Sequence, residues 1–265
     1  MARAPLVRPT DAPPRAHEPG VEAVATPDDE AAPEGPARSD LPRHVAIIMD
    51  GNRRWARARG APELDGHAAG VEAIRGLLRH AVRREIQVLT LYAFSRENWA
   101  RTDAEVVGLF GLLEAAIRSE TDELRAQGVR VRLLGRLDEL PGDTRRSIEQ
   151  ALEATAGGER LLLNVAFNYA GRTELVDAIR RIVRAGVPPD AIDESTVARA
   201  LYTSDLPDPD LVIRTGGEHR LSNFLIWQSA YAELVTTETL WPDFGPTNLD
   251  AALAEYASRT RRFGR

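Results

Sequence analysis

The 265-residue chain contains no cysteine and no lysine, and it has no apolar run long enough to span a membrane. The absence of cysteine excludes a disulfide framework and thiolate chemistry, which fits the cytoplasm. A membrane helix needs about 20 predominantly apolar residues, so we expect a soluble protein. All 34 basic residues are arginine, and any phosphate site must therefore be built from guanidinium groups.

The net charge of -6 argues against general binding to nucleic acid. With 43% hydrophobic residues the chain can bury one sizeable core. Residues 1–40 hold eight of the 17 prolines and show no apolar periodicity, so we expect a disordered tail there. No apolar segment of the signal-peptide type follows the mildly basic start. The folded domain is expected over residues 41–265.

The stretch from His44 to Trp55 is the most informative part of the chain. Its five apolar residues, 45–49, predict a strand buried on both faces. Asp50, Gly51 and Asn52 then break the run before a short helical segment. A carboxylate at the end of a strand, next to helix amides and arginines, suits a phosphate and a hard cation such as Mg²⁺. The alternative is that Asp50 merely caps the helix.

Apolar strand patterns alternate with amphipathic helices along the rest of the chain. We expect strands at 87–94, 129–134, 161–167 and 211–213, a sixth apolar segment at 234–237, and helices at 66–84, 103–127, 143–155, 173–185, 194–201 and 248–262. This order predicts an α/β fold with an open, mostly parallel six-stranded sheet and helices on both faces. The helix at 103–127 is apolar on more than one face, so it either packs on two sides or lines a hydrophobic cavity.

Polar residues follow several of these strands, namely Asp50, Asn98, Asn168 and Arg214. Because the carboxyl ends of parallel strands share one edge of a sheet, we expect these side chains to gather at one site. The sequence has no P-loop, no Gly-x-Gly-x-x-Gly after the first strand and no Gly-x-Ser-x-Gly elbow.

Four blocks of sequence carry a resemblance to a known family: His44–Trp55, Leu91–Trp99, Asn164–Arg172 and Asp210–Pro242. They resemble the cis-prenyltransferases (Z-isoprenyl diphosphate synthases), the family of undecaprenyl diphosphate synthase. The resemblance covers the expected catalytic domain at 41–265. It implies an α/β fold with a hydrophobic tunnel, lined in part by the helix that follows Asp103.

The activity that this resemblance implies is the condensation of isopentenyl diphosphate with an allylic diphosphate, such as farnesyl diphosphate. The product would be a cis-polyprenyl diphosphate that partitions to the membrane and serves as the lipid carrier for cell-wall glycans. The alternatives are a short-chain Z-prenyl diphosphate synthase and a non-catalytic partner subunit of the same fold.

The resemblance also implies the site residues. Asp50 would be the essential carboxylate that holds Mg²⁺ together with Glu233. Asn98 matches the position often assigned as proton acceptor, but a neutral amide is a weak base, so Asn98 is expected to orient a diphosphate oxygen instead. The substrate-binding residues would be Gly51, Asn52, Arg53, Arg54, Trp55, His67, Ser95, Arg96, Glu97, Trp99, Arg101, Arg214, Arg220, Leu221 and Ser222. The amides of Gly51 to Arg54, with the side chains of Arg54 and His67, would hold the allylic diphosphate. Arg214, Arg220 and Ser222 would hold isopentenyl diphosphate.

Several of these residues have a purely structural alternative. Arg214 and Arg220 could pair with Glu218, and His67 could cap a helix or lie in the core. Trp99 could be packing, and Glu233 could form a local salt bridge.

Two positions depart from the family pattern. Arg53 stands where glycine is common, which some members share, and Glu63 stands where a diphosphate-binding arginine is common. Either Glu63 points away and Arg53, Arg57 or Arg59 supplies the charge, or allylic binding is weak. On sequence alone, Glu63→Arg should tighten allylic binding.

The family forms homodimers, and a segment near the end of the chain is unusually apolar. We expect an exposed surface from Phe224, Leu225, Ile226, Trp227, Tyr231, Leu234 and Val235. Arg262 matches a tail element that reaches the partner's active site. The resemblance therefore implies a homodimer, and we expect it to be cytoplasmic, without a transmembrane segment and peripheral at the inner membrane face.

Overall fold

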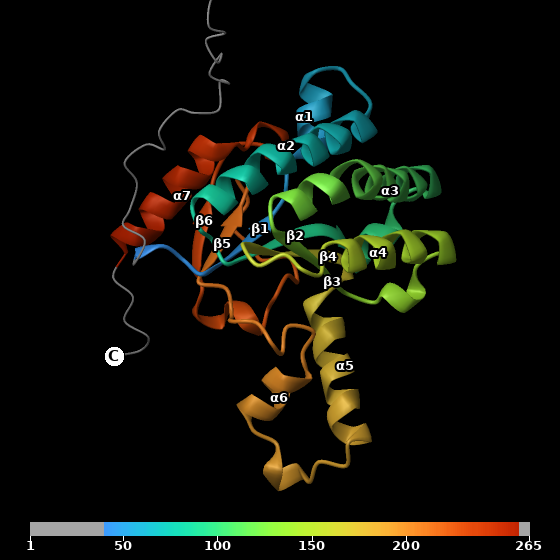
Figure 1. Cartoon of the computed structure of the whole chain (residues 1–265), viewed down its shortest axis with the longest axis vertical. Coiled ribbons are helices and arrows are strands. Elements are labelled where there is room, and N and C mark those ends of the chain that lie inside the picture. The colour runs from blue at the N-terminus through green and yellow to red at the C-terminus, as the bar shows by residue number, and fades with distance from the viewer. Residues whose placement is uncertain (1–39, 260–265) are drawn as a thin grey trace, which may run out of the picture. The chain divides into compact units, whose positions relative to one another are not determined.

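The structure is a computed structural model that describes residues 40–259, and its strands form one parallel sheet (Figure 1). The strands are β1 (His44–Ile48), β2 (Val88–Ser95), β3 (Val129–Leu134), β4 (Leu161–Tyr169), β5 (Leu211–Arg214) and β6 (Glu233–Thr236). Their order across the sheet is β3-β4-β2-β1-β5-β6, and every neighbouring pair is parallel. The predicted six-stranded α/β sheet is confirmed.

Helices lie in most of the connections between these strands, as is usual for parallel pairing, and α7 follows the last strand. They are α1 (Asn52–Ala58), α2 (Glu63–Arg83), α3 (Asp103–Ala126), α4 (Gly142–Ala154), α5 (Gly171–Arg184), α6 (Glu194–Ala200) and α7 (Pro246–Ser258). Helix α2 begins three residues before the expected start, and its first turn includes Glu63 and Asp65, which favour a helix N-terminus. No helix among residues 40–259 is both long and apolar enough to cross a membrane.

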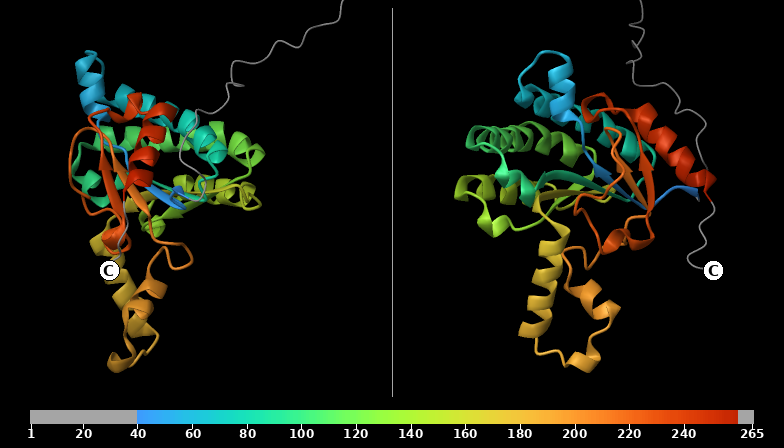
Figure 2. Two further views of the ribbon diagram at one scale, coloured as in Figure 1. Left: turned by 90° about the vertical axis from the view of Figure 1, so that its left-hand side faces the viewer. Right: turned by 180° about the vertical axis from the view of Figure 1, so that it is seen from behind.

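The sheet is buried on both faces because successive strand residues point to opposite sides. On one face, Val45 and Ile47 pack with residues such as Leu77 of α2 and Leu249 of α7. Helices α3 and α4 extend this layer over β3 and β4, whereas α5 and α6 run away from the other side of the sheet (Figures 1 and 2).

The other face of the sheet is covered mainly by the segment that leads into β6. Phe224 and Leu225 are fully buried against this face, and Val235 of β6 is buried as well. The expectation that these three residues form an exposed surface was wrong. The backbone turns back onto the sheet through positive φ angles at Ser222 (48°) and Asn223 (64°), which the sequence pattern did not reveal. Tyr231 is 76% exposed.

Candidate active site

Asp50 and Arg214 meet at the carboxyl ends of two neighbouring strands. Ile48 of β1 lies beside Arg214 of β5 in the sheet, so Asp50 is just beyond the same edge. Arg214 donates from Nη2 to Oδ2 of Asp50 at 2.8 Å, and Arg54 approaches Oδ1 at 3.2 Å. One carboxylate is therefore held between two guanidinium groups.

The guanidinium of Arg214 is buried, with only 3% of the residue exposed. It donates from Nη1 to Ser222 Oγ at 2.7 Å and to the carbonyl of Arg220, while its Nε finds no partner among residues 40–259. A buried cation needs a compensating anion, and Asp50 supplies it. The alternative that Arg214 pairs with Glu218 is wrong, whereas the side chain of Arg220 does pair with Glu218.

The backbone around Asp50 is fixed from both sides. Its carbonyl accepts hydrogen bonds from Thr215 Oγ1 at 2.6 Å and from the amide of Trp241 at 3.0 Å. Gly51, with φ at 118°, is the N-cap of α1, and no side chain caps that helix. Because Asp50 makes no capping bond, the alternative that it serves as a helix cap is wrong.

The loop after β5 is shaped to the site by glycine. Gly216 has φ at 82°, and a Cβ there would overlap the guanidinium of Arg54. Its carbonyl accepts a hydrogen bond from Arg54 Nη1 at 2.6 Å. Only a glycine combines this backbone conformation with so close an approach.

His67, Arg101 and Glu105 form a second polar group, where α2 and α3 begin. Arg101 Nη1 donates to Glu105 Oε1 at 2.6 Å and lies 3.5 Å from His67 Nε2. Burial, and next the charge of Arg101, lower the pKa of His67 to about 4. His67 is therefore neutral at pH 7, and it belongs to the body of α2, not to its cap.

Glu63 faces two arginines of α1. Arg53 Nε lies 2.5 Å from Glu63 Oε2, and Arg57 Nε donates to Oε1 at 2.9 Å. Arg59 instead lies over the ring of Trp55, 3.9 Å from its centroid. The carboxylate that departs from the family pattern thus holds Arg53 and Arg57 together.

The turn after β2 brings further predicted residues to the same edge. Asn98 accepts from the amide of Ser95 at 3.0 Å, and Glu97 accepts from Asn223 at 2.7 Å. Trp99 packs on Phe94 and Phe110, with ring centroids 5.6 and 5.5 Å away, and donates to Asn168 at 2.8 Å. Arg96 pairs with Glu139. Trp99 thus makes packing contacts while 42% of the residue stays exposed, and its substrate-binding role stays a prediction.

Two predicted residues make side-chain contacts that do not include Asp50. Trp55 donates from Nε1 to Asp243 at 2.8 Å. Glu233 of β6 lies beside Leu211 at the amino end of β5, whereas Asp50 lies beyond the carboxyl end of β1. Oε2 of Glu233 accepts a hydrogen bond from Arg259 at 2.7 Å. The local salt bridge is thus the contact that Glu233 makes in this structure, and its role as a metal ligand stays a prediction.

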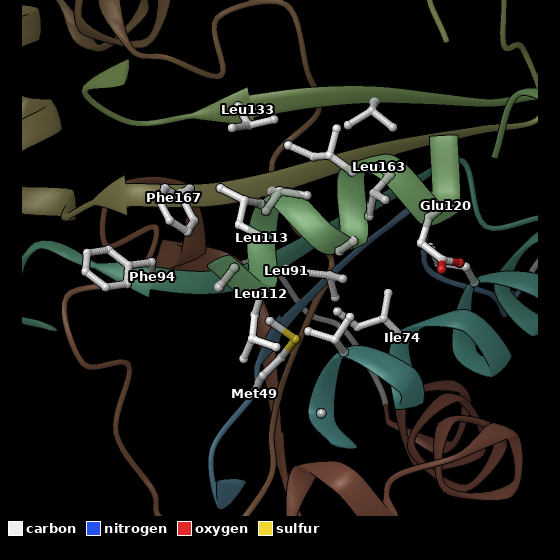
Figure 3. Close-up of a pocket in the computed structure, with 18 of the residues that line it drawn as sticks. Met49, Ile74, Leu91, Phe94, Leu112, Leu113, Glu120, Leu133, Leu163 and Phe167 are labelled. Atoms are coloured by element: carbon white, nitrogen blue, oxygen red, sulfur yellow. The ribbon is translucent and has the colours of Figure 1, made fainter. Parts of the chain in front are cut away.

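An apolar cavity lies between the sheet and helices α2 and α3 (Figure 3). Its empty volume is about 1230 Å³, including open solvent at its mouth. Asn52 and His67 line one part of it, and Asn52 Oδ1 is buried there without a partner among the described residues. Apolar residues of α3 line most of its outer wall, including Leu109, Leu112, Leu113, Ala116 and Ile117. This explains why α3 is apolar on more than one face.

Sequence reasoning missed several residues that build the site. Thr215 and Gly216 stand inside a recognised block, but their roles depend on the fold of the loop. Glu105 lies four residues after Arg101 on one helix face, a spacing that could have indicated the pair. Glu63 was noted, but its ion pairs were not expected.

The chain is similar to known isoprenyl transferases over most of its length. The family model described as "Putative undecaprenyl diphosphate synthase" matches residues 48–264. The chain is 50% identical to an isoprenyl transferase of Heliobacterium mobile over 89% of this chain and 93% of the relative, and 49% identical to isoprenyl transferase 2 of Bradyrhizobium diazoefficiens over 88% and 94%.

Two solved structures extend the likeness to the fold. Lavandulyl diphosphate synthase from Lavandula x intermedia, crystallised with dimethylallyl diphosphate, superposes with a TM-score of 0.83 at 37% identity, over 86% of this chain and 100% of that one. A probable undecaprenyl diphosphate synthase of Campylobacter jejuni superposes with a TM-score of 0.72 at 32% identity, over 84% and 99%. The chain therefore belongs to the undecaprenyl diphosphate synthase family of isoprenyl transferases.

Proposed function

We propose that the protein condenses isopentenyl diphosphate with an allylic diphosphate to form a cis-polyprenyl diphosphate. The proposed allylic substrate is farnesyl diphosphate. The observation that carries this proposal is the junction of two environments at one sheet edge. Guanidinium groups around Asp50 suit diphosphates, and the apolar cavity that Asn52 and His67 help to line suits a prenyl chain. The relative that was crystallised with dimethylallyl diphosphate supports an allylic diphosphate as one substrate.

The donor set at Asp50 fits Mg²⁺. Mg²⁺ is usually held by one or two carboxylates, substrate phosphates and several waters, not by a cage of protein ligands. Among residues 40–259 no cluster of three or more acidic or histidine side chains could hold a metal by itself. Asp50 accepts one contact on each oxygen, which leaves lone pairs for a cation. Bound Mg²⁺ would neutralise charge on the leaving diphosphate.

The chain's own residues then have separate tasks in the reaction. Arg214, Ser222 and Arg220 bind isopentenyl diphosphate, and Arg53, Arg54 and His67 bind the allylic diphosphate at the cavity mouth. The C–O bond of the allylic substrate breaks and its electron pair leaves with diphosphate. The isopentenyl double bond attacks the freed carbon, and a proton leaves the isopentenyl unit to restore a double bond. Fixed arginine charges stabilise the diphosphate as negative charge develops on it.

Asn98 acts as an orienting group in this proposal. Its carboxamide oxygen accepts from the Ser95 amide, which leaves the NH₂ group to meet a ligand. Because an NH₂ group donates hydrogen bonds, it can orient a diphosphate oxygen but cannot take the proton. The departing diphosphate is the base.

The proposal is tested by incubating the purified protein with Mg²⁺, farnesyl diphosphate and radiolabelled isopentenyl diphosphate, and by sizing the extracted products. Cis-polyprenyl products that disappear when Mg²⁺ is chelated would support it. A purified, folded protein that incorporates no label with any allylic primer would refute it. Products that stop after one addition would favour the alternative, a short-chain Z-prenyl diphosphate synthase.

We further propose that the product is the lipid carrier for cell-wall glycans and that the enzyme acts in the cytoplasm, at the inner membrane face. The enzyme would be a homodimer in which Arg262 completes the partner's site; this residue lies outside the described residues. An exposed apolar row on α5, formed by Val176, Ile179 and Val183, is a surface on which a second copy could pack. The tail at 1–40 would be dispensable, and its deletion should leave activity unchanged.

A further inference from the structure

A charged pair forms part of the wall of the apolar cavity. Arg75 of α2 and Glu120 of α3 both line it. Arg75 donates from Nε to Glu120 Oε2 at 3.0 Å and from Nη2 to Oε1 at 2.5 Å. Two parallel bonds of this kind are the strongest arrangement between arginine and a carboxylate.

The pair lies away from the polar part of the cavity lining, which is formed by Asn52 and His67. Along α2, Arg75 is eight residues beyond His67 (67 to 75), or about 12 Å at 1.5 Å per residue. Along α3, Glu120 is 15 residues beyond Glu105 (105 to 120), or about 22 Å. Figure 3 shows Glu120 at the opposite end of the cavity from Phe94. The ion pair therefore lies toward the distal end, where Leu78 and Leu124, about one turn further along the same two helices, also line the cavity.

The same pair also faces water. The side chain of Arg75 is 37% exposed and that of Glu120 is 19% exposed, although both line the cavity. Arg75 is held further by Glu72, at 3.0 Å from its Nη1. The two side chains thus bridge α2 and α3 between an apolar interior and the solvent.

We propose that the Arg75–Glu120 ion pair closes the distal end of the cavity and sets the length at which the prenyl chain stops growing. This inference rests on the proposed function, since it assigns the prenyl chain to the cavity. A chain that reaches the pair can lengthen only by separating it. Separation would break two charge-assisted hydrogen bonds and leave the carboxylate of Glu120 beside hydrocarbon without its partner, which is unfavourable even though 19% of that side chain is exposed. Further addition is then opposed, and product is released.

The test compares product lengths from matched variants, using farnesyl diphosphate and labelled isopentenyl diphosphate. Arg75→Ala and Glu120→Ala open the end, and Glu120→Gln removes the charge while keeping the shape. The charge-swapped double variant Arg75→Glu/Glu120→Arg restores a pair. The control is Arg79→Ala/Glu123→Ala, because that ion pair, at 2.6 Å, joins the same two helices one turn further on and does not line the cavity.

The single variants should make products longer by at least one isoprene unit, with an unchanged rate for the first condensation. The charge swap should return the length toward that of the unaltered protein, and the control should leave it unchanged. Unchanged product lengths in all three single variants, or an equal change of product length in the control, would overturn the proposed role of the ion pair. The proposed function would stand, because condensation continues. Absence of any product from the unaltered protein would overturn the proposed function, and with it the proposed role of the ion pair.

Discussion

Arg214 is almost wholly buried and donates to Asp50 across 2.8 Å, so the carboxylate of the site also neutralises a cation in the core. The two roles are coupled. A change at Asp50 alters the chemistry at the sheet edge and also removes the anionic partner of Arg214, which is only 3% exposed.

Replacing Asp50 with alanine should therefore lower both activity and stability. Turnover should fall below about a tenth of the unaltered rate, which corresponds to an increase of more than about 1.4 kcal/mol in the activation free energy. The free energy of unfolding should fall by about 1–3 kcal/mol, because Arg214 loses an acceptor. Urea unfolding and product assays measure the two effects. Asp50→Asn, which keeps an acceptor oxygen, should recover much of the stability and little activity. Retention of both properties in Asp50→Ala would contradict the assignment.

The buried histidines should make stability depend on pH. Burial lowers the pKa of His44 to about 4, against 6.5 for a free side chain, and burial with Arg101 does the same for His67. Between these values the unfolded chain binds more protons, so the free energy of unfolding decreases as the pH falls from 6.5 to about 4. Urea unfolding at pH 7 and pH 5 measures the loss, which should be smaller in His67→Gln. An identical pH dependence in that variant would exclude His67 as a contributor.

Glu63→Gln should weaken allylic binding, because Glu63 holds Arg53 and Arg57. The expected result is a higher Michaelis constant for the allylic diphosphate and little change for isopentenyl diphosphate. Glu63→Arg should also raise that constant, since it removes the anchor and adds a third guanidinium. This reverses the expectation drawn from sequence alone.

The control for Glu63 is Asp243→Asn, which alters a carboxylate 3.4 Å from Arg59, on the same face of α1 as Trp55. It should leave both Michaelis constants unchanged. Tighter allylic binding in Glu63→Arg would restore the original expectation and show that the ion pairs of Glu63 do not position Arg53.

The sequence alone was sufficient to predict the parallel sheet and the edge of the sheet at which the candidate site lies. Apolar runs such as 45–49 and 211–213 must be buried on both faces, and parallel pairing then gathers Asp50 and Arg214. These conclusions depend on local pattern and on general rules of parallel sheets. The apolar character of α3 likewise indicated the cavity.

Contacts between distant residues could not be predicted in this way. The pairing of Glu63 with Arg53 depends on how α1 and α2 pack, and the salt bridge of Glu233 depends on α7. Leu225 is buried and has φ at 44°, a backbone conformation that favours glycine. Because the residue is a leucine, the sequence does not indicate a turn at this position. A strained backbone is stable only where the surrounding fold holds it.

The last prediction concerns the row of apolar side chains on α5. Val176, Ile179 and Val183 are 45%, 57% and 69% exposed, and their spacing places them on one face of the helix. If this face forms the proposed homodimer, Val183→Glu should raise the dissociation constant at least about tenfold, since burying a carboxylate costs more than about 1.4 kcal/mol. Sedimentation velocity over a range of concentrations measures it.

Val107→Glu is the matched control. Val107 lies on α3 and is 71% exposed, so this variant makes the same substitution on an exposed surface away from α5. It should leave the dimer intact. An Asp50→Ala chain mixed with a chain truncated after Arg261 should regain part of the activity, because one site of the heterodimer keeps both Asp50 and the partner's tail. Val183→Glu in both chains should abolish this recovery. A fully active monomer at assay concentrations would instead show that the site is complete within one chain and that the α5 row has another use.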